Sequence, residues 1–205
     1  MKTALVFHPE YLRHRIPFPH PESPERVIKT LVAARKYGVL GKDVTLIEPR
    51  PASIEDVLMV HSANYVEQLA KGRGWLDADT PIYHGVLRRA LFAAGGGITA
   101  VKDILTGKYS KAFVLARPPG HHASRGRGGG FCYLNNVAIT AEWALRQGFK
   151  KIFILDWDAH HGDGTQDIFY HRPEILFISI HQDPSTLYPG TGYIWELGEG
   201  EGEGF

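Results

Sequence analysis

The sequence has a single cysteine, Cys132, in 205 residues. One thiol cannot form an internal disulfide or a cysteine-based zinc site, so any metal has to be bound by other residue types. An excess of one charge is also lacking, because 23 Lys and Arg against 22 Asp and Glu give a net charge of +1. This balance provides no general attraction to nucleic acid or to a membrane surface.

Long hydrophobic runs are missing as well. The N-terminus offers one lysine and a short apolar stretch, 3–7, before His8 and Pro9. This stretch is too short for a signal peptide, and no run approaches the length of a membrane span. We therefore expect a cytoplasmic protein with neither a membrane nor a nucleic-acid partner.

The composition is that of a globular protein, with 43% hydrophobic and 22% charged residues. The length predicts one domain. Its apolar pattern predicts strands at 3–7, 44–47, 112–116, 151–155 and 175–180, long helices at 24–37, 84–105 and 136–146, and short helices from about 53, 62 and 165. Continuous apolar strands separated by helices indicate an α/β fold with a doubly wound, mainly parallel sheet and helices on both faces.

Glycine and proline mark two of these helices. Ser23, Pro24 and Gly38 stand at the positions expected for the N-cap, first residue and stop of helix 24–37. Within helix 84–105 lie three consecutive glycines, 95–97. Glycine is costly inside a helix unless something packs closely against it, so we expect either a break or a tight helix contact there.

Polar residues follow three of the predicted strands where each strand ends. They are His121 and His122 after the first, Asp156, Asp158, His160 and Asp163 after the second, and His181 and Asp183 after the third. In parallel α/β sheets, ligands bind beyond the carboxyl ends of the strands. We therefore expect these side chains to meet in one site.

Asp156, Asp158 and His160 have the spacing of metal ligands. In an extended segment, side chains two residues apart point the same way. Two carboxylates and an imidazole suit Zn²⁺, Fe²⁺ or Mn²⁺. The alternative is that Asp156 only caps the following turn. We favour the metal site, because unpaired buried charges are too costly to retain.

The tandem pair His121 and His122 offers a proton acceptor and a proton donor for metal-bound water. Each imidazole would need a carboxylate to fix its tautomer and orientation. Asp156 and Asp163 are available for this task.

Several longer motifs together resemble the histone deacetylase superfamily, including bacterial acetoin-utilisation-type and acetylpolyamine deacetylases. The runs that carry the resemblance are HPESPER (20–26), HSANYV (61–66), RPPGHHA (117–123), GFCYLNNVAI (130–139), DWDAHHGDGT (156–165), SIH (179–181) and YPGTG (188–192). The resemblance implies an arginase/deacetylase-like fold. It also implies a zinc-dependent amidohydrolase that removes an acetyl or other acyl group from an acylated lysine or polyamine.

Roles for individual residues follow from the resemblance by position. Asp158 and His160 would ligate zinc, His122 would be the general base paired with Asp163, and His121 would pair with Asp156. The implied channel walls are Gly130, Phe131 and Tyr188, and the implied structural K⁺ or Na⁺ site comprises Asp156, Asp158, His160 and Ser179.

The family's third zinc ligand, an Asp on a later strand, and its transition-state-stabilising Tyr lie beyond the motifs matched here. We therefore expect 1–205 to be a single deacetylase-like domain, incomplete at its C-terminal end, which a missing segment or an oligomer partner completes. An exposed strand edge and an uncovered apolar face would result.

Two other functions compete with a deacetylase. An arginase-type ureohydrolase would hold two manganese ions, but the tandem histidines and Phe131 argue against it. An inactive, truncated binding module would have no use for two His–Asp pairs. The arginines Arg117, Arg125 and Arg127 near the expected site are interpreted as solvated or internal anchors. The expected partner is a small acylated amine or an acetyl-lysine protein.

Overall fold

The computed structural model describes residues 2–16, 18–41 and 43–205. The strands are β1 (Thr3–Val6), β2 (Val44–Ile47), β3 (Gly74–Trp75), β4 (Pro81–Ile82), β5 (Lys111–Val114), β6 (Ile152–Asp156) and β7 (Ile175–Ser179). The helices are α1 (Glu10–Arg13), α2 (Pro24–Lys36), α3 (Ile54–Leu58), α4 (Ala63–Ala70), α5 (Val86–Leu105), α6 (Asn136–Arg146) and α7 (Asp163–Phe169), with a 3₁₀ turn at Gly200–Gly202. The strands and helices expected from the apolar pattern are confirmed.

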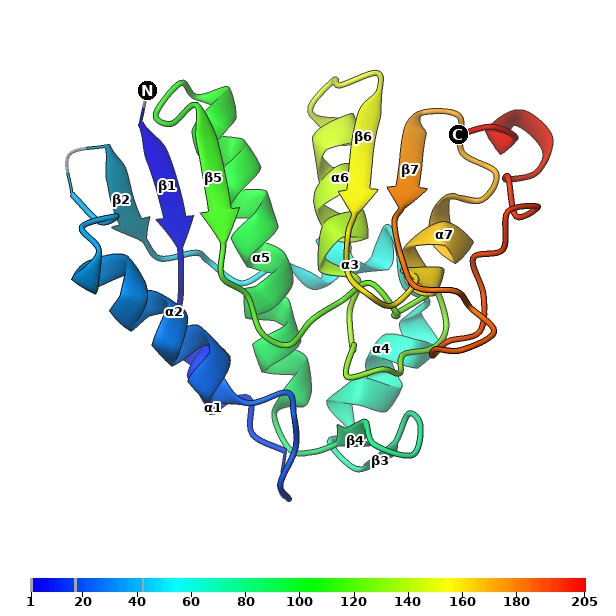
Figure 1. Ribbon diagram of the computed structural model, residues 1–205, viewed down its shortest axis with the longest axis horizontal. Helices are drawn as coiled ribbons and strands as arrows, with labels where there is room; N and C mark the ends of the chain where they lie inside the picture. Colours follow the sequence, from blue (N-terminus) through cyan, green and yellow to red (C-terminus); the bar gives the residue numbers. More distant parts are fainter. Residues whose placement is uncertain (1, 17, 42) are drawn as a thin grey trace.

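The five longer strands lie in one layer and point the same way (Figure 1). β1 pairs in parallel with both β2 and β5, and β6 pairs in parallel with β7. Across the described ranges, β5 and β6 share no ladder, so the layer consists of two separate sheets. The parallel α/β fold is confirmed, whereas the order of segments along the chain does not reveal this division.

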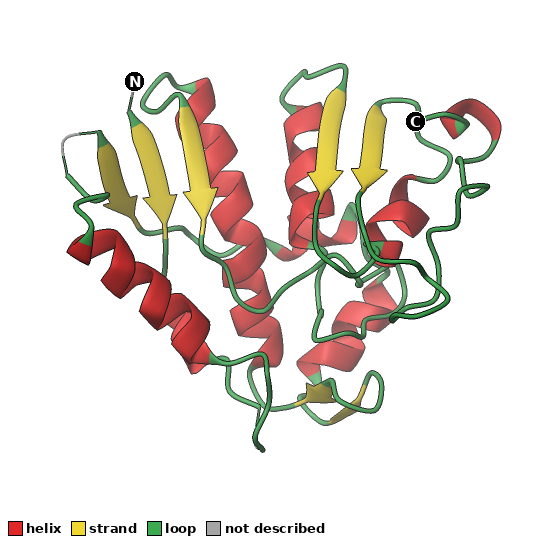
Figure 2. Ribbon diagram, viewed as in Figure 1, coloured by secondary structure: helices red, strands yellow, loops and turns green. Residues whose placement is uncertain are grey.

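Helices α5 and α6 lie behind the strands and connect the two sheets (Figure 2). Ala100 of α5 packs beneath β1, and Ala138 of α6 belongs to the same core cluster as Ile154 of β6. The glycines of α5 allow this arrangement, because a Cβ on Gly97 would overlap the Thr140 side chain of α6. The helix is unbroken here, so the expected tight contact is the alternative that is confirmed.

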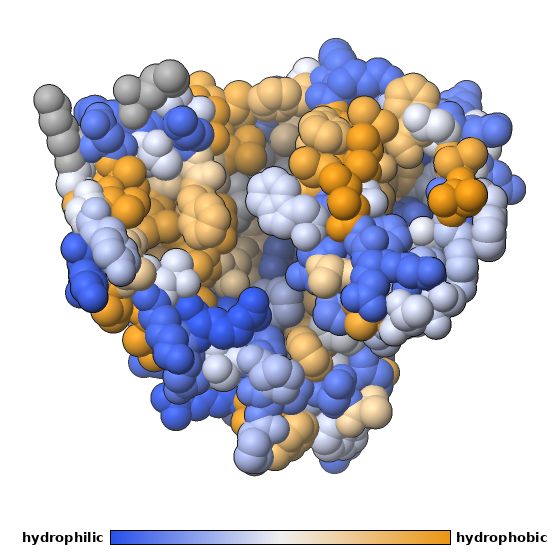
Figure 3. Space-filling view, viewed as in Figure 1, coloured by the Kyte–Doolittle hydropathy of each residue, from blue (hydrophilic) through white to orange (hydrophobic). Residues whose placement is uncertain are grey.

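Apolar side chains remain exposed on the strands on both sides of the division. Phe113 of β5 and Phe153 of β6 are each 57% exposed. An apolar groove of about 460 Å³ runs between α5, α6 and β6. Figure 3 shows hydrophobic surface on either side of the hollow between the sheets.

The signals at the ends of α2 are also confirmed. Ser23 is at the N-cap position, although its side chain accepts no capping hydrogen bond. Pro24 begins the helix, and Gly38 adopts the left-handed conformation with φ +67°. Among the helices of the described ranges, none is both long and apolar enough to cross a bilayer. The short helix α1 and the β3–β4 hairpin are additions that the sequence pattern did not predict, because they are too short to show a period.

Candidate active site

The ends of β5 and β6 lead into one cavity of about 540 Å³. It is lined by Arg26, Asp79, Pro119, His121, His122, Gly130, Phe131, Asp158, Ala159, His160 and Tyr188. Of the eight residues that the strand-end rule predicts, four line this space, and Asp156 and Asp163 contact its two imidazoles. His181 lies instead beside Ser179 in a separate pocket, and Asp183 accepts a hydrogen bond from Ser185, so the rule is wrong for these two residues.

The turn that carries His121 and His122 is held by hydrogen bonds from two later elements. Asn135 caps α6 through its side-chain oxygen and donates from Nδ2 to the Ala123 carbonyl (3.0 Å). The Thr165 amide of α7 donates to the His121 carbonyl (3.0 Å). α7 begins directly against this turn, since a Cβ on Gly164 would lie 2.5 Å from the His122 carbonyl carbon. The imidazoles are thus fixed by backbone packing.

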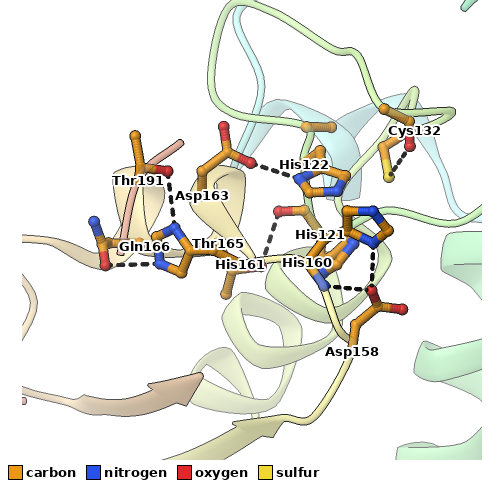
Figure 4. Close-up of polar contacts among 12 residues, drawn as sticks. His121, His122, Cys132, Asp158, His160, His161, Asp163, Thr165, Gln166 and Thr191 are labelled. Carbon is orange, nitrogen blue, oxygen red and sulfur yellow. Dashed lines mark hydrogen bonds and ion pairs between the residues drawn. The ribbon is translucent and has the colours of Figure 1, made fainter. Parts of the chain in front are cut away.

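Two His–Asp pairs stand side by side. His121 Nδ1 lies 2.8 Å from Asp156 Oδ2, and His122 Nδ1 lies 2.6 Å from Asp163 Oδ1. The centroids of the two imidazole rings are 4.0 Å apart. Figure 4 shows the His122–Asp163 contact with both imidazoles directed into the same region. The pairing inferred from the resemblance is the pairing in the structure.

The environments of the two imidazoles differ. Burial acts to lower the pKa of His121, but the hydrogen bond that it donates to Asp156 and the charges of the surrounding carboxylates outweigh this effect, so its pKa is raised. Burial also lowers the pKa of His122, and the nearby charge of His121 lowers it further. The hydrogen bond to Asp163 raises this pKa by less than the other two effects lower it, so the pKa of His122 is lowered. His121 therefore keeps its proton to a higher pH than His122 does.

Asp158 and His160 are the two metal-ligand candidates that meet at the cavity. His160 Nδ1 and the His160 amide nitrogen each lie 2.9 Å from Asp158 Oδ1. A carboxylate and an imidazole are donors that zinc accepts, but catalytic zinc sites have three protein ligands. In the part of the chain that the structure describes, no group of three or more His, Cys, Asp or Glu side chains is arranged to hold a metal ion. The chemistry of these two side chains fits zinc, and a zinc ion held by Asp158 and His160 would need a third ligand.

Asp156 takes a different position from the one that the i, i+2, i+4 spacing predicts. The chain turns after Asp156 instead of staying extended. Asp156 Oδ1 accepts the Asp158 amide (3.1 Å) while Oδ2 faces His121. Asp156 and Ser179 are register partners on β6 and β7, and the Ser179 hydroxyl lies 2.8 Å from His181 Nδ1.

Aromatic rings form the side walls of the cavity. Tyr188 stands edge-on to His122 with ring centroids 5.0 Å apart, and Phe131 lines the same space. Burial, with nearby Asp carboxylates, raises the pKa of Tyr188 to about 12, so its phenol stays neutral. A Cβ on Gly130 would overlap the His122 ring, so glycine is required for this close approach.

Sequence reasoning missed the part of the wall that the β3–β4 hairpin supplies. Asp79 lines the cavity, Asp77 Oδ2 accepts the Gly130 amide (2.7 Å), and Thr80 Oγ1 accepts the Phe131 amide (2.9 Å). The only sequence signal is the polar turn DADT at 77–80. This signal is too short to distinguish a functional turn from an ordinary one.

Arg117 is an internal anchor, one of the two interpretations that the sequence allowed. Its Nε and Nη2 donate to the two carboxylate oxygens of Glu22 at 2.6 and 2.7 Å. The guanidinium also donates to the carbonyls of Tyr11 and His14. This buried cluster fixes the HPESPER segment to the chain just before the two histidines, whereas the Arg127 side chain is 69% exposed.

Comparison with known proteins identifies the family of the chain. Residues 20–205 match the family model described as "Histone deacetylase domain". All of the chain aligns at 53% identity with a "Probable deacetylase" of Archaeoglobus fulgidus, covering 58% of that protein. A second alignment, with the "Histone deacetylase-like amidohydrolase" of Pseudomonas aeruginosa, has 40% identity and covers 91% of this chain and 50% of that protein.

The fold has a close match among solved structures. The crystal structure of the HDA15 HD domain superposes with a TM-score of 0.92 at 35% identity, over 98% of this chain and 60% of that one. The chain thus spans about half to three fifths of the length of these relatives. With the family model matched over residues 20–205, the chain belongs to the histone deacetylase domain family.

Proposed function

We propose that this chain carries the acid–base groups and channel walls of a metal-dependent amidohydrolase that removes an acyl group from an acylated amine. The observation that carries the proposal is the adjacent pair of His–Asp contacts, 2.8 and 2.6 Å long, at a cavity with aromatic side walls. Two oriented imidazoles of opposite protonation preference suit a reaction that needs one base and one acid.

The pairing defines what each imidazole does. The Asp163 carboxylate accepts a hydrogen bond, so His122 Nδ1 carries the hydrogen and His122 Nε2 is left to accept a proton from attacking water. His121, held in its charged form by Asp156, stabilises the negative charge that develops on the acyl oxygen and supplies a proton to the departing amine.

Asp158 and His160 would hold the metal, for which we propose zinc, with Fe²⁺ or Mn²⁺ as substitutes. A bound zinc ion polarises the acyl carbonyl and lowers the pKa of water toward neutrality. We propose that the third protein ligand lies in the part of the relatives' length that the alignments with this chain do not cover. A K⁺ or Na⁺ ion beside Asp156, Asp158, His160 and Ser179 is proposed as a structural ion.

The shape of the cavity favours a slender substrate. Phe131 and Tyr188 present aromatic surface to a chain of methylene groups, as in an acetyl-lysine side chain or an acetylated polyamine. We propose this class of substrate, with the acyl group directed toward His121 and His122.

The test is acetate release from an acetyl-lysine peptide and from an N-acetylated polyamine, with Zn²⁺ added, by the protein in which this chain is joined to the segment proposed to supply the third ligand. His122→Ala and Asp163→Asn are each expected to lower the rate by roughly a hundredfold or more. His171→Asn is the matched control, because His171 is a surface histidine with a 66% exposed side chain. The proposal fails if the His122 variant releases acetate at the wild-type rate.

Two outcomes would favour the other functions. Saturable binding of the acetylated amine, with no release of acetate, would indicate a binding module. Two manganese ions per chain, with hydrolysis of a guanidinium compound, would indicate a ureohydrolase.

A further inference from the structure

Phe131 has a backbone conformation that bulky residues rarely adopt. Its φ is +70°, and it is the one non-glycine residue with positive φ among those described. A left-handed conformation of this kind costs an aromatic residue free energy and persists only where the surroundings impose it.

The turn around Phe131 explains the conformation. Gly129 and Cys132 exchange both backbone hydrogen bonds, at 3.1 and 2.8 Å, so Gly130 and Phe131 are the central residues of a two-residue hairpin. Both have positive φ, +51° and +70°. Positive φ at both central positions is the mark of a type I′ turn, whose second position usually holds glycine. Here the second position is occupied by Phe131, whose side chain lines the cavity.

Two side chains of the β3–β4 hairpin bind this turn from outside. Asp77 Oδ2 accepts the Gly130 amide at 2.7 Å, and Thr80 Oγ1 accepts the Phe131 amide at 2.9 Å. These contacts join segments about fifty residues apart in the sequence. The amides of both central residues are therefore held by acceptors that are themselves fixed in a tight turn, closed by the Leu76 amide and the Thr80 carbonyl (2.9 Å).

The two acceptors are well placed to keep their geometry. Thr80 is fully buried, and the Asp77 carboxylate also accepts the Asp79 amide (3.1 Å). The Phe131 ring packs edge-on against His20, with centroids 4.4 Å apart. Release of the turn toward ordinary negative φ would rotate the ring out of this contact and change the width of the cavity.

We propose that Asp77 and Thr80 are positioning residues that set the width of the substrate channel by holding the Gly130–Phe131 turn in its left-handed form. This inference rests on the proposed function, since it assigns selectivity to the same cavity. It predicts discrimination between an unbranched amine stem and one that is branched beside the amide.

The experiment compares Thr80→Val, which keeps the shape and removes the acceptor, with Thr80→Ser, which keeps the hydroxyl. Asp77→Ala and Asp77→Asn form a second, independent pair. We expect the Val and Ala variants to speed amide hydrogen exchange at the bonded residue, Phe131 or Gly130, by about tenfold, the equivalent of one hydrogen bond. We also expect the ratio of kcat/KM for unbranched over branched N-acetylated amines to fall by about tenfold, mainly through KM of the unbranched substrate. The Ser and Asn variants should stay near the wild type.

Three results separate the possibilities. Unchanged amide exchange in Thr80→Val and Asp77→Ala would overturn the inference, and so would faster exchange with an unchanged substrate ratio. If the wild-type protein, with the segment that supplies the third ligand in place, hydrolyses neither amine, the proposed function is refuted, while the exchange data still decide whether Asp77 and Thr80 hold the turn.

Discussion

Glu22→Gln is expected to destabilise the protein strongly, because it breaks a buried ion pair from one side. The side chains of Arg117 and Glu22 are 3% and 1% exposed, and two hydrogen bonds join them. Glutamine keeps a similar volume and one acceptor but leaves the guanidinium without its counter-charge. Removing one partner of a buried pair costs about 3–5 kcal/mol.

The predicted loss is large enough to measure by thermal unfolding. In a domain of roughly 150–250 residues, each kcal/mol lowers Tm by about 2–4 °C, so we expect a decrease of roughly 6–20 °C. The matched control is Glu25→Gln, three positions along the same motif, where the side chain is exposed. Circular dichroism melts of the two variants against the wild type provide the comparison.

The pH dependence gives an independent measure of the same pair. Burial alone would raise the pKa of Glu22, but the hydrogen bonds from His14 and Arg117 outweigh it and lower the pKa from 4.5 to about 2. Because the folded pKa is the lower one, this stabilisation is complete above about pH 4.5 and is lost as the pH falls toward 2. The shift corresponds to a stabilisation on the order of 3 kcal/mol.

The difference in unfolding free energy between the wild type and Glu22→Gln should therefore shrink across this pH range. Equal Tm losses for Glu22→Gln and Glu25→Gln, or a difference that stays constant down to pH 2, would refute the reasoning.

Three further predictions concern other parts of the molecule. Asp158→Asn should lower the zinc retained after dialysis, measured by elemental analysis, and unchanged zinc content would contradict the ligand assignment. Phe153→Lys should reduce the fluorescence of a bound hydrophobic dye, because Phe153 lines the apolar groove and is 57% exposed. The control is Val32→Lys on α2, at a position that is 58% exposed, and it should leave the fluorescence nearly unchanged. Gly97→Ala should lower the unfolding free energy by about 1–3 kcal/mol through overlap with the Thr140 side chain. Adding Thr140→Ala should recover part of that loss, and strictly additive effects in urea denaturation would argue against the contact.

The meeting of the His–Asp pairs could be predicted from the sequence for a simple physical reason. β5 and β6 belong to separate sheets, but their strands lie in one layer and point the same way, so the residues that follow them emerge on the same side of the layer. His121, His122 and Asp163 follow strand ends, and Asp156 is the last residue of β6. Their proximity could therefore be predicted without the order of the strands, whereas which histidine pairs with which carboxylate came from the family resemblance.

The parts that escaped prediction depend on contacts with no periodic signal. Strands β3 and β4 have two residues each, so alternation cannot reveal them. Positive φ at Phe131 is invisible in a sequence that places a phenylalanine where glycine is usual. The prediction that Asp156 and Asp158 point to the same side was wrong, because it required an extended chain, whereas the backbone turns directly after the strand.

Because the strands form two separate sheets, the distances within the His–Asp pairs depend on how the sheets are held together. The imidazoles follow β5, their carboxylates follow β6, and α5 against α6 connects the sheets to which these strands belong. If α5 and α6 moved slightly apart, the two sheets would separate and both His–Asp contacts would lengthen together. A methyl group added at Gly97 would push α5 and α6 apart, so a substitution far from the cavity would alter the geometry of both His–Asp pairs without contacting either.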